Sequence, residues 1–201
     1  MHIVLRNGLV AHGRRSIVDV AAWLQVPHRA IGTARRMMVP RSSSQADIML
    51  QALTNHNPDA IVVDELSTSS DVRAAQAISQ RGVSLVATAH GSTISALLAN
   101  KELNRLLGGI HEVILSDAAL RQLDRGGGRG AFARGRDAKT RQERRGTPVF
   151  TQAVELRSPQ EWRIHWDVAT SVDALLEGRA PPVEHRAVID GVLHSNGVPM
   201  R

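Results

Sequence analysis

Ala60-Ile61-Val62-Val63-Asp64-Glu65 is the stretch that decides the fold expected for this chain. An apolar run that ends in two carboxylates is typical of a buried parallel strand leading into a polar loop. Ligands of open α/β sheets bind beyond the carboxyl ends of such strands, so Asp64 and Glu65 would lie at a ligand-binding edge. In phosphoryl transfer, one acid at this place holds Mg²⁺ and a second orients the attacking water. The six residues alone are equally consistent with a strand that simply runs into a polar turn.

The residues that follow predict a helix and a second strand. Residues 66–71 are rich in N-cap types, residues 72–79 have good helix propensity, and Gly82 is placed to end the helix. Residues 83–87 form another apolar run. The order strand, helix, strand indicates a parallel, right-handed crossover.

Such a crossover would bring the polar residues that follow the two strands to one edge of the sheet. They are Asp64, Glu65, Thr88 and His90. This edge is where a γ-phosphate would be sensed. A histidine that follows a strand is more often an ordinary loop residue, so a role for His90 depends on the acids of the neighbouring strand.

Further segments occur in a definite order along the chain: residues 26–40, 55–58, 61–65, 81–83, 87–91, 107–110, 143–144, 148–150, 154–156, 162–165 and 171–173. Together, over roughly residues 17 to 180, they resemble the AAA-type ATPases that include stage III sporulation protein AA and its cyanobacterial and plastid relatives. The interval from Asp64 to His90 also looks like that of the secretion and pilus motor ATPases, whose second box ends in Thr-x-His.

The resemblance implies an α/β fold: a partial P-loop NTPase of the RecA/AAA-like type. Its parallel sheet would carry helices on both faces and would be followed by a C-terminal β-hairpin and helix. The resemblance also implies ATP and Mg²⁺ as ligands. Asp64 would then hold the metal, Glu65 and His90 would be catalytic, and Thr88 would contact the nucleotide.

Two catalytic elements of that family are missing or altered in this sequence. There is no GxxxxGK loop followed by Ser or Thr, in which backbone N–H groups would cradle the phosphates, and the only lysines are Lys101 and Lys139. Asp19 matches an acidic box, but Trp23 stands where relatives carry a Glu. We therefore expect a truncated or degenerate ATPase portion with little or no activity alone.

Three arginines are candidates for an arginine finger, a side chain that reaches the γ-phosphate bound by a neighbouring subunit. Arg35 and Arg36 follow a plausible helix start at residues 27–30, but ordinary surface charge is the simpler interpretation. Arg81 precedes Gly82 and suits a helix C-terminus, where a cation meets the negative end of the helix dipole.

Composition excludes several other classes of protein. The chain has 201 residues, no Cys, no Tyr and only 2% aromatic residues, so we expect an aliphatic core and no disulfide or thiolate site. The nine His show no ligand spacing, so we expect no structural zinc. No apolar run reaches a membrane span, so a soluble protein is expected, with plastid and cytoplasm both left open.

The positive charge is concentrated between residues 121 and 145. This stretch contains nine basic and three acidic residues. The surplus of six positive charges equals the net charge of +6 for the whole chain. The Gly/Arg-rich centre should be a mobile loop, and such a loop can bind nucleic acid phosphates through Arg129, Arg134 and Arg136, with Phe132 available to stack on a base. A solvated loop in a protein rich in Arg is the simpler interpretation, and we favour it over nucleic-acid binding.

Five segments are expected: a divergent N-terminal segment (1–15), a truncated ATPase core (16–120), the basic loop (121–145), C-terminal strands and helix (146–178) and a flexible tail (179–201). Within them we predict a helix over 46–53, a sheet strand over 110–115, an edge hairpin over 150–156 and 162–166, and a helix over 168–176.

Three functions from different classes remain in view. The first is an ATPase-family polypeptide that binds nucleotide by descent. The second is a non-catalytic partner that forms a homo- or hetero-oligomer with an intact ATPase relative. The third is a basic protein that binds nucleic acid without sequence preference.

Overall fold

The fold is described from a computed structural model covering residues 2–7, 16–22, 32–114 and 140–196. The elements follow in this order: β1 (His2–Arg6), β2 (Ile17–Ala22), β3 (Arg35–Val39), α1 (Gln45–Asn55), β4 (Ala60–Leu66), α2 (Ser69–Gln80), β5 (Ser84–His90), α3 (Ile94–Ala99), the 3-10 helix η2 (Leu103–Leu107), β6 (Ile110–Ile114), β7 (Thr140–Arg144), β8 (Gln152–Ser158), β9 (Glu161–His165), α5 (Val168–Leu176), β10 (Glu184–Ile189) and β11 (Val192–Asn196).

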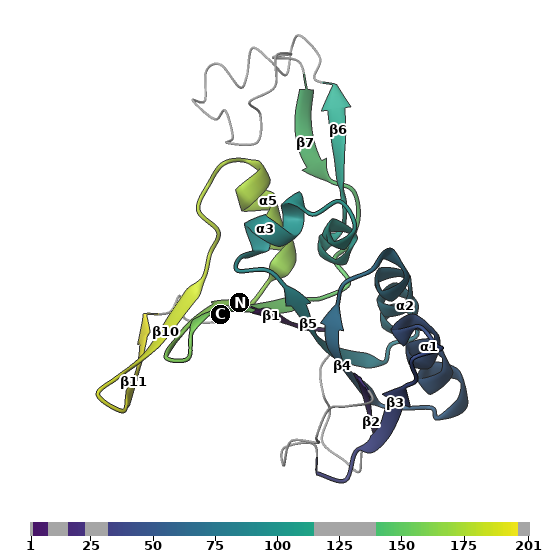
Figure 1. The fold of residues 1–201 in the computed structure, drawn as a ribbon. Coiled ribbons are helices and arrows are strands. Elements are labelled where there is room, and N and C mark those ends of the chain that lie inside the picture. Colours follow the sequence, from purple (N-terminus) through teal and green to yellow (C-terminus); the bar gives the residue numbers. More distant parts are fainter. Residues whose placement is uncertain (1, 8–15, 23–31, 115–139, 197–201) are drawn as a thin grey trace.

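The main sheet is mixed rather than parallel throughout. Its order is β11-β10-β9-β8-β1-β5-β4-β2-β3. Three neighbouring pairs are parallel: β5 with β4, β4 with β2, and β2 with β3. The other neighbouring pairs of this sheet are antiparallel. The expected α/β fold with parallel strands is therefore confirmed for one half of the sheet, and C-terminal antiparallel strands form the other half (Figure 1).

One face of the sheet carries the hydrophobic core. The strand side chains in it occupy matching register positions: Ile3 and Leu5, Val18 and Val20, Ile61 and Val63, Leu85, Ala87 and Ala89, and Ala153. The alternate positions Val4, Val62 and Val86 are only partly buried. Because strand side chains alternate between faces, the core lies on one side of the sheet.

The described helices pack on that core face, so the expectation of helices on both faces is not met in this part of the chain. The reason is topological. The steps from β3 to β4 and from β4 to β5 cross the sheet in the same direction, and right-handed crossovers then place α1 and α2 on the same side. The two helices lie against each other beside β4 (Figure 1).

Both helix starts follow from local chemistry. The Ser44 hydroxyl accepts a hydrogen bond from the Asp47 N–H at the start of α1. At the start of α2, Thr68 and Asp71 form a reciprocal capping box, as the N-cap-rich residues 66–71 predict. Gly82 follows the end of α2 with a φ of 76°, a left-handed backbone conformation that glycine adopts readily.

The strand predicted over 110–115 is present as β6, but it is not a member of the main sheet. It pairs with β7 in a separate two-stranded ribbon that projects from the fold (Figure 1). Residues 140–144, expected within the basic loop, belong to that ribbon. Arg144 anchors it to α5 through two hydrogen bonds to Asp173, of 2.9 and 2.8 Å. Periodicity predicts a strand, but only the tertiary structure selects its partner.

The C-terminal helix predicted over 168–176 coincides with α5, and the predicted hairpin is β8–β9. That hairpin does not lie at the edge, because β1 pairs with β8 and β10 pairs with β9. Residues 179–201, expected to be a flexible tail, contain the hairpin β10–β11. Glu184 holds this hairpin in place by accepting hydrogen bonds from Trp166, Ser195 and Arg186.

Gly108 lies where the chain leaves η2 for the ribbon, and it tolerates no side chain. Its φ is 101°, and an added Cβ would lie 2.4 Å from the Gly146 carbonyl oxygen. Gly82 has a similarly positive φ of 76° but open space around the same position. A comparison of the same substitution at the two glycines therefore separates the cost of backbone strain from the cost of steric overlap.

We predict that Gly82→Ala costs about 1 kcal/mol of unfolding free energy, from backbone strain alone. Gly108→Ala should cost clearly more, because a backbone atom must also move. Urea unfolding of the two variants checks this. Equal losses would show that the close contact at Gly146 does not constrain the fold.

Candidate functional site at the carboxyl edge of the parallel strands

Asp64 and Thr88 meet at the carboxyl edge of β4 and β5, as the crossover predicts. The Thr88 hydroxyl donates to Asp64 Oδ1 at 3.2 Å and accepts a hydrogen bond from the Glu65 N–H at 2.8 Å. Asp64 and Glu65 are exposed, whereas Thr88 is partly buried. The threonine therefore connects the two strands and holds an exposed carboxylate in place.

Glu65 has a backbone conformation that is unusual for a residue with a side chain. Its φ is 51°, and the pairing of β4 with β5 is irregular between Val63 and Leu66. Such residues are often found at functional sites, where the surrounding contacts maintain the strain. Here the contacts are the Thr88 hydroxyl at its N–H and the Gln45 amide, which donates to its carbonyl at 3.2 Å.

Asp19 is a buried carboxylate on the face of the sheet opposite the core. It lies in β2 beside Val62, and Asp64 follows two residues later in β4. Its side chain is 3.9 Å from the Arg36 guanidinium. Burial raises the pKa of Asp19; Arg36 lowers it and Asp64 raises it, leaving the pKa above its usual range. Asp19 and Asp64 therefore interact electrostatically.

The other predicted site residues have simpler placements. His90 is exposed at the end of β5, where its backbone pairs with His2. Arg35 and Arg36 lie in β3, not in a helix, because this stretch pairs with β2 as a strand. Arg81 is the C-cap residue of α2, the position preferred for it. Arg129, Phe132, Arg134 and Arg136 lie outside the described residues.

The donors at the edge match the ligands that Mg²⁺ prefers, which are carboxylate and hydroxyl oxygens. Asp64 is exposed and fixed by Thr88, so it could hold a hydrated Mg²⁺. Within the described part of the chain, no group of three or more His, Cys, Asp or Glu residues is arranged to enclose a metal. The arrangement thus suits a metal shared with a ligand and water, not a fully protein-enclosed metal.

A buried polar network that the sequence did not suggest joins β8, β9, α3 and α5. Ser171 Oγ lies 3.0 Å from His165 Nδ1, and His165 Nε2 lies 3.3 Å from Glu155 Oε1. The Ile94 N–H donates to the same carboxylate at 2.8 Å. The order resembles a nucleophilic triad, but Ser171 is fully buried and cannot meet a substrate. The network therefore positions secondary structure.

Opposing effects set the pKa of Glu155. Burial raises it, but contacts with His165, the Ile94 N–H and Arg157 outweigh burial and keep the pKa below its ordinary value. Sequence reasoning missed this group because its partners are up to 61 residues away along the chain.

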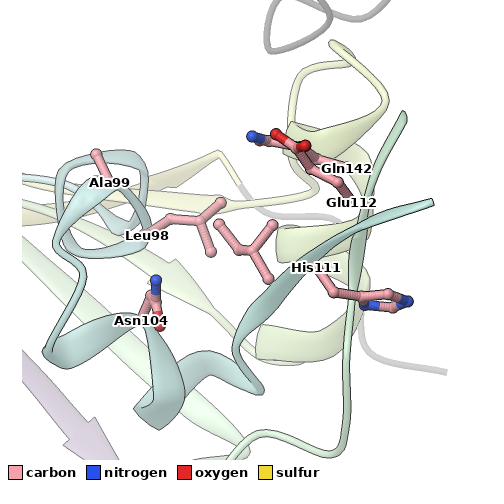
Figure 2. Close-up of a pocket in the computed structure, with 7 residues that line it drawn as sticks. Leu98, Ala99, Asn104, His111, Glu112 and Gln142 are labelled. Atoms are coloured by element: carbon pink, nitrogen blue, oxygen red, sulfur yellow. The ribbon is translucent and has the colours of Figure 1, made fainter. Parts of the chain in front are cut away.

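The ribbon β6–β7 and the helices near it enclose a hollow of about 350 Å³, away from the carboxylate edge. Figure 2 shows Leu98 directed toward the ribbon, Glu112 and Gln142 close together on the ribbon, and the His111 ring turned to its far side. Its lining combines the aliphatic residues Leu98, Ala99 and Ile110 with polar ones, and both kinds occur on the helical side and on the ribbon. This hollow contains none of the residues predicted as a site.

Fold and site together define an α/β protein with a mixed sheet and a carboxylate-bearing edge beyond its parallel strands. The chain is homologous to the protein SEEDLING PLASTID DEVELOPMENT 1 of Arabidopsis thaliana, with 44% identity over 163 residues, or 81% of this chain. It is also similar to the uncharacterized protein ycf45 of Porphyra purpurea, with 37% identity over 86% of the chain, and of Cyanidium caldarium, with 38% identity over 76%.

The expected relationship to a plastid protein is confirmed by this homology. The aligned parts make up 22%, 28% and 42% of the three relatives, so the chain matches less than half of each. No family model matches the chain, and no solved structure matches it. In the part that the structure describes, no helix is long and apolar enough to cross a membrane.

We predict that Glu155→Gln lowers the unfolding free energy at neutral pH by roughly 1 to 3 kcal/mol, because it removes the buried charge that accepts from the Ile94 N–H and pairs with Arg157. A lowered folded-state pKa stabilises the fold above the unfolded value near 4.5, and this contribution disappears as pH falls through the folded pKa.

The difference between wild type and Glu155→Gln should therefore shrink below about pH 4.5. Urea unfolding across pH measures it, with the exposed Glu161→Gln as the control. A difference that stays constant with pH would contradict the stabilising role of the Glu155 charge.

Proposed function

We propose that the carboxyl edge of β4 and β5 is the metal-holding half of a nucleotide-binding site, and that the chain is an ATPase-family polypeptide that binds Mg²⁺ with ATP. The observation that carries the proposal is the placement of Asp64 by Thr88 across two neighbouring parallel strands. Ligands of α/β sheets bind at such an edge. The proposed finer fold is that of a partial P-loop NTPase.

Each residue has a role that its chemistry supports. Asp64 would bind Mg²⁺ through the exposed carboxylate, and Thr88 would keep that carboxylate from turning away. Glu65, exposed and adjacent, would accept a proton from an attacking water. Asp19 and Arg36 would adjust the charge behind the metal. When bound, Mg²⁺ would neutralise phosphate charge.

The triphosphate needs a cradle, and the sequence contains no GxxxxGK loop followed by Ser or Thr to supply it. The strand next to β5 on its other side is β1, which runs antiparallel and presents its amino end there. No strand-to-helix turn therefore follows β1 at this edge. An intact relative that supplies the phosphate-binding loop in trans would complete the site, which makes a homo- or hetero-oligomeric assembly part of the proposal.

The name of the Arabidopsis relative refers to plastid development, and this supports a plastid location for the chain as a proposal. Plastid import can be followed directly with a fluorescent fusion to a full-length relative.

We predict that the purified chain binds ATP only in the presence of Mg²⁺, and that Asp64→Asn weakens binding roughly tenfold or more, because a charged ligand becomes neutral. Isothermal titration calorimetry measures both. Asp190→Asn is the matched control, since it makes the same change in a distant turn where φ is 51° and Asn is well tolerated. Absence of Mg²⁺-dependent binding by the wild type would end the proposal.

Hydrolysis by the chain alone should be at least roughly a thousandfold slower than by an intact motor ATPase, because phosphate positioning supplies much of this catalysis. Release of inorganic phosphate from a clean preparation measures the rate. A rate comparable with that of an intact enzyme would contradict the need for a phosphate loop in trans.

A further inference from the structure

A second polar hollow, of about 670 Å³, lies between η2, the Gly108–Gly109 turn and the segment after β7. We call it the basic groove and define it by Lys101, Arg105 and Arg145, the three cations that line it. Asn104 and Thr147 add neutral donors. None of the described residues that line the groove is acidic.

The cations are available for a ligand. All three side chains are exposed, and among the described residues none of them forms an ion pair. This differs from the neighbouring Arg141 and Arg144, whose charges are matched by Glu177 and Asp173. Three like charges without acids in one groove repel each other unless an anion is bound.

Backbone contacts hold the two walls of the groove together. The Arg145 N–H donates to the Gly109 carbonyl at 2.9 Å, and the Gly146 N–H donates to the Gly108 carbonyl at 3.0 Å. Arg105 belongs to η2, whose C-cap is Gly108. The backbone of Gly146 approaches Gly108 so closely that a Cβ at position 108 would overlap it. This close approach fixes the position of Arg145 relative to Arg105.

We propose that the basic groove binds the phosphates of a single-stranded nucleic acid. Guanidinium groups pair well with phosphate oxygens, and a positively charged groove is the feature with which proteins follow the backbone of a single strand. No aromatic ring is among the described residues that line it, so the contacts that we propose are to phosphates and are independent of sequence. The net charge of +6 favours association.

The inference does not depend on the proposed nucleotide site, because the basic groove and the carboxylate edge share no residue. It also differs from binding through residues 121–139, which lie outside the described part. Those residues stay unchanged in every variant below, so their contribution appears as a constant background.

The test is fluorescence anisotropy of a labelled oligothymidylate with the full chain, at salt concentrations from about 50 to about 200 mM. Neutralising one phosphate-binding cation lowers the slope of log affinity against log salt by about 0.7 for a single strand. Lys101→Gln, Arg105→Gln and Arg145→Gln should each show this change, and the triple variant should lose about 2 units of slope.

Arg179→Gln is the control, because it removes the same charge from a residue outside the groove that pairs with Glu177. It should leave the slope unchanged, as should Asp64→Asn. Far-UV circular dichroism confirms folding of each variant, and the single variants keep the test decisive if the triple variant fails to fold. Single and triple variants with wild-type slopes would overturn the proposal.

Two competitors separate a nucleic-acid strand from other anions. Unlabelled oligothymidylate should displace the probe, whereas inorganic pyrophosphate and polyglutamate should compete much more weakly, because they lack an extended chain of phosphates. Equal competition by pyrophosphate would overturn the strand proposal in favour of a small phosphate ligand. Equal competition by polyglutamate would overturn the preference for phosphate.

Discussion

The whole fold depends on β1, which hydrogen-bonds on both of its edges. One edge pairs with β5 of the parallel half, and the other pairs with β8 of the antiparallel half. Ile3 and Leu5 point into the core from this five-residue strand and are fully buried. Without β1 there would be a parallel αβ unit and an antiparallel meander, each with an exposed edge and an incomplete core. The same strand limits the candidate site, because its antiparallel direction leaves no strand-to-helix turn beside β5.

The two sites that we propose use opposite charges on different elements. The carboxylate edge presents Asp64 and Glu65 beyond the parallel strands, where a cation with a phosphate ligand would be attracted. The basic groove presents Lys101, Arg105 and Arg145 between η2 and the ribbon. In the first, a threonine hydroxyl fixes one carboxylate; in the second, a contact between two glycines fixes the walls.

Local sequence signals were reliable where the structure depends on neighbours in sequence. The caps and periodicity that predict α2 and α5, and the apolar runs that predict β4 and β5, correspond to elements of the structure. Predictions failed where a distant partner decides the outcome. Residues 110–114 form a strand as expected but pair with 140–144, and residues 184–196 are a hairpin instead of a loose tail, because Glu184 collects hydrogen bonds from Trp166, Arg186 and Ser195. Those bonds keep the pKa of Glu184 at about 2.

By itself, the sequence determined β4, α2 and β5 and the edge where Asp64 and Thr88 meet, because right-handed crossovers leave little choice of topology. It also determined the aliphatic core, in which Phe150 is the one aromatic among the fully buried hydrophobic residues that the structure describes. Only the tertiary structure decided the direction of β1, the buried contacts of Glu155 with His165 and Ile94, and the grouping of cations in the basic groove. These depend on pairings between residues far apart in the chain, which local pattern does not encode.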